Sequence, residues 1–173
     1  MDGQVRQGFI AVGANLGNRW ATIQGALARL SSTPGISHLE ASPLYETAPV
    51  GGVTQPDFLN LVVGVETTLA PEDLLTQLHA IEWTFGRNRA GEVRWGPRPL
   101  DLDLLVVAGE TRRHLYLELP HPRMFSRPFV MIPLRALLAR SAHYRAQDWP
   151  EMAGAAEAGG VTPWLPPSGT GSV

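Results

Sequence analysis

The chain has 173 residues, of which 44% are hydrophobic and 17% are charged, as in a soluble globular domain with its own core. Its formal net charge of −2 argues against a broad electrostatic contact with nucleic acid. The absence of cysteine excludes disulfides, thiolate zinc sites and a cysteine nucleophile, and the absence of lysine excludes Schiff-base chemistry and a GxxxxGK phosphate loop.

The amino-terminal residues have no long apolar stretch after a basic start, so we expect no signal peptide. Apolar runs such as residues 104–108 are far too short to span a membrane. We therefore expect a cytoplasmic protein, monomeric, with neither a membrane nor a nucleic acid as partner.

The first half of the chain begins with a strand and a helix. Residues 9–12 predict a short buried strand, and residues 13–18 are interpreted as a simple turn because they match neither GxGxxG nor GxxxxGK. A helix follows and ends at residues 33–35. Residues 36–46 predict a strand, with Pro43 marking an edge or a bulge. The apolar face of the helix consists of Trp20, Ile23, Leu27 and Leu30.

The next elements repeat this order. Residues 47–57 are rich in Gly and Pro and predict a loop, and residues 58–67 alternate as a strand does. A second helix begins at Pro71 and is followed by a loop over residues 86–97. The buried stripe of this helix is expected to be Leu74, Leu75, Leu78, Ile81 and Phe85.

The last elements are a central strand over residues 100–107, a strand around 115–119 and a short helix within 129–139. The order strand-helix-strand-strand-helix-strand predicts an α+β, ferredoxin-like three-layer sandwich with extra C-terminal elements. We expect residues 1–140 to be the catalytic domain. Residues 141–173 are expected to be a loosely packed or partly disordered extension, onto which Trp149 and Trp164 could dock.

Two carboxylates stand at the start of the central strand. Asp101 and Asp103 share one strand face, with Cα atoms about 6.5–7 Å apart. Such carboxylates are costly to bury without a partner, and a magnesium ion that also binds substrate phosphates is one partner. Ion pairs with neighbouring arginines are the other interpretation, since Asp-x-Asp by itself is common.

Two basic groups flank these carboxylates. The loop before the strand carries Arg87, Arg89, Arg94 and Arg98, whose guanidinium groups suit phosphate oxygens. A solvated basic loop is the alternative. After the strand, neutral His121 could contact a base or sugar and Arg127 a phosphate, although a histidine in a turn is more often structural.

A polar residue interrupts the strand over residues 58–67. Asn60 shares a face with Phe58, and a buried Asn needs partners for its donors and its acceptor. Backbone groups are the default partners of an isolated Asn. The alternative is a flat heterocycle that stacks on the Phe58 ring and presents an amide-like edge.

Together these residues resemble 6-hydroxymethyl-7,8-dihydropterin pyrophosphokinase, a family of folate synthesis. The resemblance covers residues 9–138, and its most specific part is RWGPRPLDLD at residues 94–103. It is supported by VGANLG at residues 12–17, by QPDFLN at residues 55–60, and by LPH at residues 119–121 with Arg127 and Phe129.

The resemblance implies transfer of the β,γ-diphosphate of ATP to the pterin hydroxymethyl oxygen with release of AMP. It implies two Mg²⁺ ions held by Asp101 and Asp103, and phosphate contacts from Arg87 and Arg98. ATP would be contacted by His121, Arg127, Arg89 and Trp95, with Glu82 also at an active-centre position. Pterin would be bound by Phe58, Phe129, Asn60 and the backbone between Thr47 and Gly51.

Three positions depart from the family pattern. Phe58 stands where Tyr is frequent, Pro122 where an aromatic often follows the histidine, and Ala90 where a basic residue is sometimes found. Two other functions remain open from the residues alone. A metal-dependent phosphohydrolase would use water as nucleophile and need no heterocycle pocket. A non-catalytic module would bind an anion without turnover.

Overall fold

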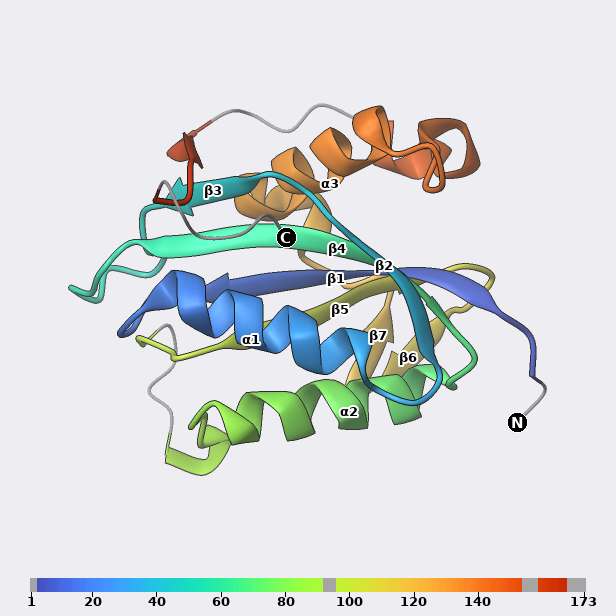
Figure 1. Ribbon diagram of the computed structural model, residues 1–173, viewed down its shortest axis with the longest axis horizontal. Coiled ribbons are helices and arrows are strands. Elements are labelled where there is room, and N and C mark those ends of the chain that lie inside the picture. The colour runs from blue at the N-terminus through green and yellow to red at the C-terminus, as the bar shows by residue number, and fades with distance from the viewer. Residues whose placement is uncertain (1–2, 92–95, 154–158, 168–173) are drawn as a thin grey trace.

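An antiparallel sheet forms the centre of the computed structural model, which describes residues 3–91, 96–153 and 159–167 (Figure 1). Its three long strands are β1 (Arg6–Ala14), β4 (Phe58–Thr67) and β5 (Asp101–Val107). The shorter β2 (Ile36–Ala41) and β3 (Leu44–Thr47) both pair with β4, and β8 (Val161–Trp164) pairs with β3. The strand order is β5-β1-β4-β3-β8, with β2 also on β4. In the described sheet β5 therefore lies at the end of the order, and the expectation of a central strand over residues 100–107 is wrong.

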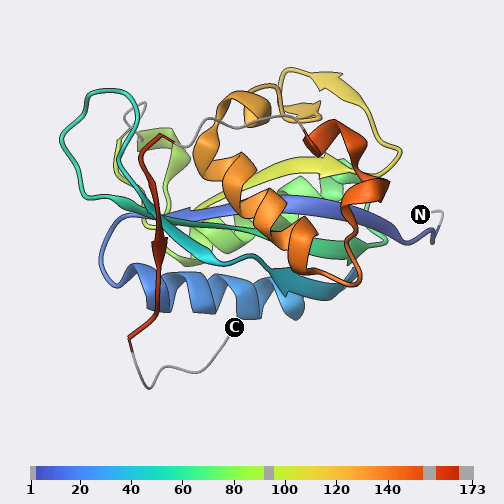
Figure 2. The ribbon, with the colours of Figure 1, turned by 90° about the horizontal axis from the view of Figure 1, so that it is seen from above.

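In the part of the chain that the structure describes, three α-helices cover the two faces of the sheet. Helices α1 (Arg19–Ser31) and α2 (Pro71–Thr84) lie on one face, and α3 (Pro128–Arg140) lies on the other (Figures 1 and 2). This three-layer arrangement follows from the alternation of β4, because Leu59 and Leu61 pack toward α1 and α2 while Val62 packs toward α3. The expected α+β class is confirmed, and the sheet is antiparallel.

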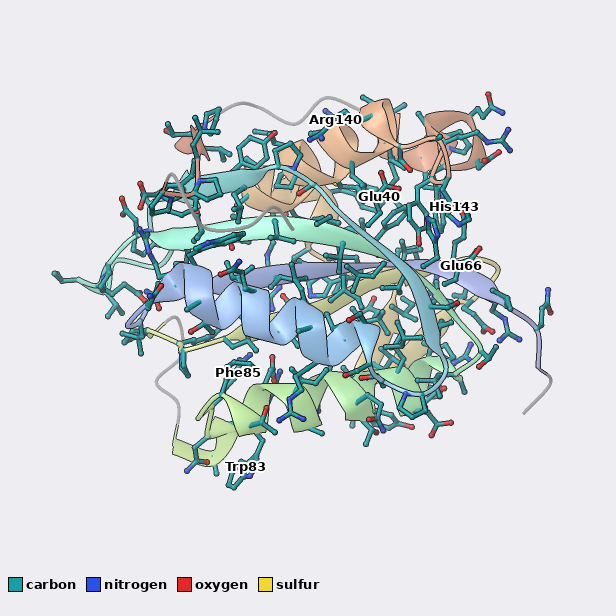
Figure 3. The ribbon with its side chains drawn as sticks, viewed as in Figure 1. Glu40, Glu66, Trp83, Phe85, Arg140 and His143 are labelled. Carbon is teal, nitrogen blue, oxygen red and sulfur yellow. The ribbon has the colours of Figure 1, made fainter. Side chains whose placement is uncertain are left out.

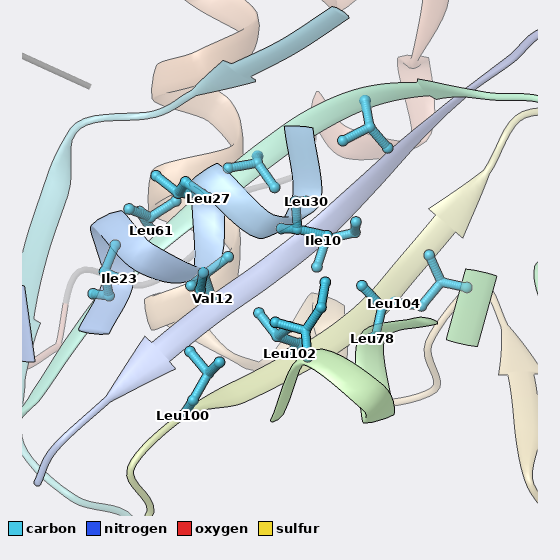
Figure 4. Close-up of a cluster of buried hydrophobic side chains, with 14 of the residues drawn as sticks. Ile10, Val12, Ile23, Leu27, Leu30, Leu61, Leu78, Leu100, Leu102 and Leu104 are labelled. Carbon is cyan, nitrogen blue, oxygen red and sulfur yellow. The ribbon is translucent and has the colours of Figure 1, made fainter. Parts of the chain in front are cut away.

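The face under α1 and α2 holds the larger core. Figure 4 shows Ile10 and Val12 of β1 and Leu102 of β5 among the side chains of α1 and α2. Asn18 caps α1, since its side chain accepts a hydrogen bond from the backbone N–H of Ala21, and Pro71 opens α2. The predicted apolar face of α1 is confirmed: all its members are buried, namely Trp20, Ile23, Leu27 and Leu30.

The opposite face is completed by the segment after α3. Tyr144, Trp149 and Met152 are buried, and the rings of Tyr144 and Trp149 meet that of Phe9 edge-on. The expectation of loose packing is therefore wrong for residues 141–153, because large apolar side chains anchor this segment. Its division from residues 1–140 as a separate unit stays a prediction.

Polar contacts also fix this segment. Figure 3 shows His143 close to Glu66 of β4, and His143 Nε2 lies 2.9 Å from Glu66 Oε1. The Ser141 hydroxyl donates to Glu40 of β2 over 2.6 Å. Further along, β8 adds a strand to the edge of β3, and Trp164 lies near Trp20 of α1.

Several strands differ from their predicted extents. The first, predicted over residues 9–12, is longer and runs as β1 from Arg6 to Ala14. The segment 36–46 is broken into β2 and β3 at Ser42 and Pro43, where Ser42 donates its backbone N–H to Val62 and its hydroxyl oxygen accepts from the N–H of Val62. The strand expected around 115–119 is one arm of a hairpin, formed by β6 (Arg112–His114) and β7 (Leu117–Leu119).

The described residues also form four short 3-10 turns: η1 (Arg89–Gly91), η2 (Met124–Ser126), η3 (Ala146–Asp148) and η4 (Pro150–Ala153). Helix α3 continues through Pro133, whose ring is buried. Among the described residues, no helix is both long enough and apolar enough to cross a membrane.

Candidate active site

A cavity of about 330 Å³ lies on the α3 side of the sheet, at the end that α3 leaves uncovered. On this face the strands change from apolar residues, such as Val62 and Leu105 under α3, to polar ones, such as Asn60 and Asp103. The polar and aromatic residues that line the cavity are Thr47, Phe58, Asn60, Arg87, Arg89, Arg98, Asp101, Asp103, His121, Arg123, Arg127 and Phe129.

The register of the sheet brings the two halves of this lining together. Gly13 of β1 lies opposite Asn60 on one side and opposite Asp101 on the other. A Cβ at Gly13 would lie 2.6 Å from Asn60 Oδ1, which is closer than such contacts occur. Gly13 thus leaves open the space between the amide and the carboxylates.

Asp101 is held by two arginines. Arg87 donates to Asp101 Oδ1, and Arg98 donates to Asp101 Oδ2 over 2.8 Å. Burial opposes the charged form of Asp101, but the two guanidinium groups outweigh it and lower the pKa of this carboxyl. Asp101 is therefore ionised and fixed at neutral pH.

Asp103 lies two residues further along β5, where its surroundings disfavour the charged form of its carboxyl. Burial and the charge of Asp101 raise the pKa of Asp103, and His121 and Arg127 offset only part of this. Arg127 Nη1 lies 3.2 Å from Asp103 Oδ2, and the same guanidinium lies over the Phe129 ring at 5.6 Å. Burial lowers the pKa of His121, so its ring is neutral at pH 7.

Glu82 of α2 holds the arginines of the cavity from the α2 side of the sheet. Its side chain is 1% exposed, and it accepts hydrogen bonds from Arg87, from Arg89 and from the backbone N–H of Leu102. Burial raises the pKa of Glu82, with the arginines acting in the opposite direction. Glu82 therefore positions Arg87, which reaches Asp101, and does not line the cavity itself.

The other half of the cavity carries an amide and two aromatic rings. Asn60 is 8% exposed and donates from Nδ2 to Thr47 Oγ1 over 2.6 Å. Phe58 of β4 and Phe129 of α3 line the cavity from different elements. The Asn60 amide thus donates to a side-chain hydroxyl and not, as the default interpretation expected, to a backbone group. The strand face that carries Phe58 and Asn60 lines the cavity.

The cavity collects most of the site residues predicted from the sequence. Gly51 is exposed and does not line it, and Trp95 lies outside the described residues. Sequence reasoning missed the buried Asn15, which was interpreted as part of a simple turn, although an Asn directly after a buried strand was the available signal. It also missed the contribution of Arg123.

This geometry bears on both interpretations of Asp101 and Asp103, as ion-pair partners and as metal ligands. Each pairs with an arginine, as the ion-pair reading expects. In the part of the chain that the structure describes, no group of three or more His, Asp or Glu side chains converges as a metal site. Two carboxylates with arginines around them form a site whose chemistry suits phosphate groups.

An antiparallel α+β domain with arginines and carboxylates around one cavity is typical of a broad class of proteins that handle phosphate groups. The chain belongs to the family described as 7,8-dihydro-6-hydroxymethylpterin-pyrophosphokinase (HPPK), which matches residues 9–139. The resemblance recognised in the sequence is thereby confirmed.

Individual relatives agree with this family. A protein of Bacillus subtilis named 2-amino-4-hydroxy-6-hydroxymethyldihydropteridine pyrophosphokinase is 43% identical over 73% of this chain and 74% of its own length. One of the same name from Pseudomonas aeruginosa is 41% identical over 77% of this chain and 81% of its own length. The folate synthesis bifunctional protein of Arabidopsis thaliana is 46% identical, but the match spans only 26% of that longer chain.

The fold is also found among solved structures. The HPPK-DHPS of Plasmodium falciparum in its complex with pteroate aligns with a TM-score of 0.60 over 79% of this chain and 39% of its own, at 14% identity. This likeness concerns the fold.

Proposed function

We propose that this protein transfers the diphosphate group of ATP to the hydroxymethyl group of 6-hydroxymethyl-7,8-dihydropterin, releasing AMP, in tetrahydrofolate biosynthesis. It would act as a 2-amino-4-hydroxy-6-hydroxymethyldihydropteridine diphosphokinase, the activity for which its 41–43% identical relatives are named. One observation carries the proposal: a single cavity joins a carboxylate and arginine half to an amide and aromatic half.

The carboxylate and arginine half suits the triphosphate of ATP. Arg98 and Arg87 both pair with Asp101 and both line the cavity, so their guanidinium groups lie where phosphate oxygens would bind. Arg127 and neutral His121 lie at the Asp103 side, where they would contact the nucleotide. Arg89, fixed by Glu82, adds charge at the rim.

Magnesium fits this half. Asp101 and Asp103 offer hard oxygen donors on one face of β5, and the pKa of Asp103 is raised partly by the charge of Asp101, a repulsion that a cation would relieve. Because only two carboxylates converge among the described residues, phosphate oxygens and water would complete the coordination. Bound Mg²⁺ would neutralise the charge that develops on the transferring group. The count of two ions stays a prediction.

The amide and aromatic half suits a pterin. Asn60 is held by Thr47 and presents its amide toward the cavity, where it would pair with the polar edge of the heterocycle. Phe58 and Phe129 offer the ring faces between which a flat molecule would stack. The loss of a hydroxyl relative to Tyr at position 58 leaves this stacking face intact.

Catalysis by these residues is chiefly positioning and charge stabilisation. The pterin hydroxyl must approach the β-phosphorus in line with the bond to the α-phosphate oxygen, which then leaves with AMP. Arg98 and Arg87 would stabilise the charge on the transferring oxygens, since they are already ordered by Asp101 and Glu82. Ordered donors need little rearrangement as the charge moves.

The test is a reaction of ATP, magnesium and the hydroxymethyl pterin, analysed for AMP, ADP and phosphate. Formation of AMP with pterin diphosphate supports the proposal. Phosphate release without pterin would identify a phosphohydrolase, and no turnover would identify a binding module. Asp101→Ala and Asp103→Ala should each lower turnover by at least about a hundredfold. The control Asp148→Ala removes a carboxylate paired with Arg145 at the surface and should keep parent turnover.

We infer a ferredoxin-like core, supported by the strand order β5-β1-β4 with β2 and β3 beyond β4 and by helices in the two crossover connections. A monomeric state and a cytoplasmic location stay predictions.

A further inference from the structure

The turn between β1 and α1 contacts both halves of the cavity without lining it. Asn15, the residue directly after β1, is 1% exposed. Toward the phosphate half, its Oδ1 accepts from the backbone N–H of Arg98 over 2.8 Å, and its own N–H donates to the Arg98 carbonyl over 3.2 Å. Asn15 therefore holds the Arg98 backbone by two hydrogen bonds, one accepted by its side chain and one donated by its own N–H.

The same side chain reaches the loop before Phe58. Asn15 Nδ2 donates to Gln55 Oε1 over 2.9 Å and to the Pro56 carbonyl over 3.0 Å. With both amide hydrogens and the amide oxygen engaged, no other residue type of this size supplies the same three bonds. One buried amide thus joins residues separated by more than forty positions in sequence.

A second side chain, at the start of α1, also contacts the loop before Phe58. Arg19, the first residue of α1, donates to the Asp57 carbonyl over 2.8 Å and pairs with Glu46 of β3 over 2.6 Å. Glu46 and Asp57 flank the loop on either side, so Arg19 ties both its ends to α1. Neither Arg19 nor Asn15 lines the cavity.

We propose that Asn15, assisted by Arg19, is a positioning residue that sets the distance and orientation between the phosphate half and the pterin half. This inference rests on the proposed function. Arg98 carries the charge that meets the transferring group, and residues 55–57 lead directly into Phe58. Because Asn15 bonds to both segments, it fixes the approach of one substrate to the other, on which an in-line transfer depends.

The decisive variant is Asn15→Ala, with Asn18→Ala as matched control. Asn18 lies in the same turn and caps α1, so its loss should destabilise the protein without touching Arg98 or the loop. We expect Asn15→Ala to lower kcat by at least about tenfold, because small misplacements of reacting groups are costly, while the Kd for ATP changes by less than about threefold. Asn18→Ala should keep the parent kcat.

A second variant and a second measurement keep the inference testable if Asn15→Ala does not fold. Arg19→Gln keeps a polar side chain but loses the ion pair, and should lower kcat by about threefold or more through the loop alone. Hydrogen exchange should be faster in residues 52–60 and 96–100 of Asn15→Ala, and in residues 52–60 alone of Arg19→Gln. In Asn18→Ala these segments should exchange at the parent rate.

The outcomes separate this inference from the proposed function. If the parent forms no AMP from ATP and the pterin, the proposed function fails, and hydrogen exchange alone decides whether Asn15 joins the two segments. If the parent is active and Asn15→Ala keeps its kcat, the inference is overturned. It is overturned equally if Asn18→Ala lowers kcat as much, because the effect would then follow stability. Should Asn15→Ala fail to fold, an unchanged kcat in Arg19→Gln overturns it.

Discussion

The contribution of the buried Glu82 carboxylate to the free energy of unfolding can be measured by substitution. Glu82 is 1% exposed and accepts from Arg87, Arg89 and the backbone N–H of Leu102. Glu82→Ala would remove the carboxylate that pairs with Arg87, whose side chain is 3% exposed. Breaking a buried ion pair in this way typically costs about 3–5 kcal/mol. We expect a loss of that size in the free energy of unfolding.

Glu82→Gln should be less damaging. The glutamine oxygen can still accept from the N–H of Leu102, and burial raises the pKa of Glu82, so the negative charge itself is costly at this place. We expect a loss of about 1–3 kcal/mol, the cost of weakened hydrogen bonds to charged groups. Because Arg87 loses its fixed position, kcat should fall by at least about tenfold in Glu82→Ala.

Urea unfolding of the parent and the variants measures these losses, with steady-state AMP formation as the second readout. Glu72→Ala is the matched control on the same helix, since Glu72 pairs with Arg112 at the surface and should contribute at most about 1 kcal/mol. A loss below about 1 kcal/mol in Glu82→Ala, equal to that of Glu72→Ala, would refute the reasoning.

Three further predictions concern other parts of the domain. Gly13→Ala should weaken pterin binding by at least about tenfold, because its Cβ would meet Asn60 Oδ1, and should spare ATP binding in separate calorimetric titrations; equal weakening of both would contradict this. Gly64→Ala would place a Cβ 2.6 Å from the ring of the buried Tyr144, so urea unfolding should show a loss of about 1–3 kcal/mol, and an unchanged midpoint would count against it. Burial, with Arg89 and Arg87, lowers the pKa of His79, so the unfolded chain takes up the proton first below about pH 6.5; the parent should therefore lose more stability than His79→Gln between pH 7 and pH 5.5, and parallel curves would contradict this.

The elements of the domain were predictable wherever one face of a strand or helix is buried. Strand β4 was predicted with its observed bounds, because residues 58–67 alternate between two apolar faces and are followed by a clear helix start at Pro71. The carboxylates and arginines of the cavity were predictable because they cluster in sequence, around Asp101. Such local patterns need no knowledge of distant partners.

What could not be predicted depends on contacts between distant residues. Tyr144 packs on Gly64, eighty positions earlier, and nothing near Tyr144 in sequence indicates that partner. Asn15 was assigned to a simple turn because its partners, Gln55 and Arg98, lie on two other loops. Composition suggested loose packing after residue 140 because Gly, Ala and Pro are frequent there, although a few large side chains suffice to anchor a segment.

The packing of residues 144–152 has a consequence for folding during synthesis. Phe9 is among the first core residues to leave the ribosome, yet two of the rings that cover it, those of Tyr144 and Trp149, are made more than 130 residues later. Until then, the part of the α3 face around Phe9 stays accessible to water and to other nascent chains. We therefore expect the domain to complete its fold only after release of this segment. Ribosome-stalled chains that end near residue 140 can be compared with chains that continue past residue 152 into a linker long enough to place that segment outside the exit tunnel. Chaperone binding to the shorter chains should exceed that to the longer ones.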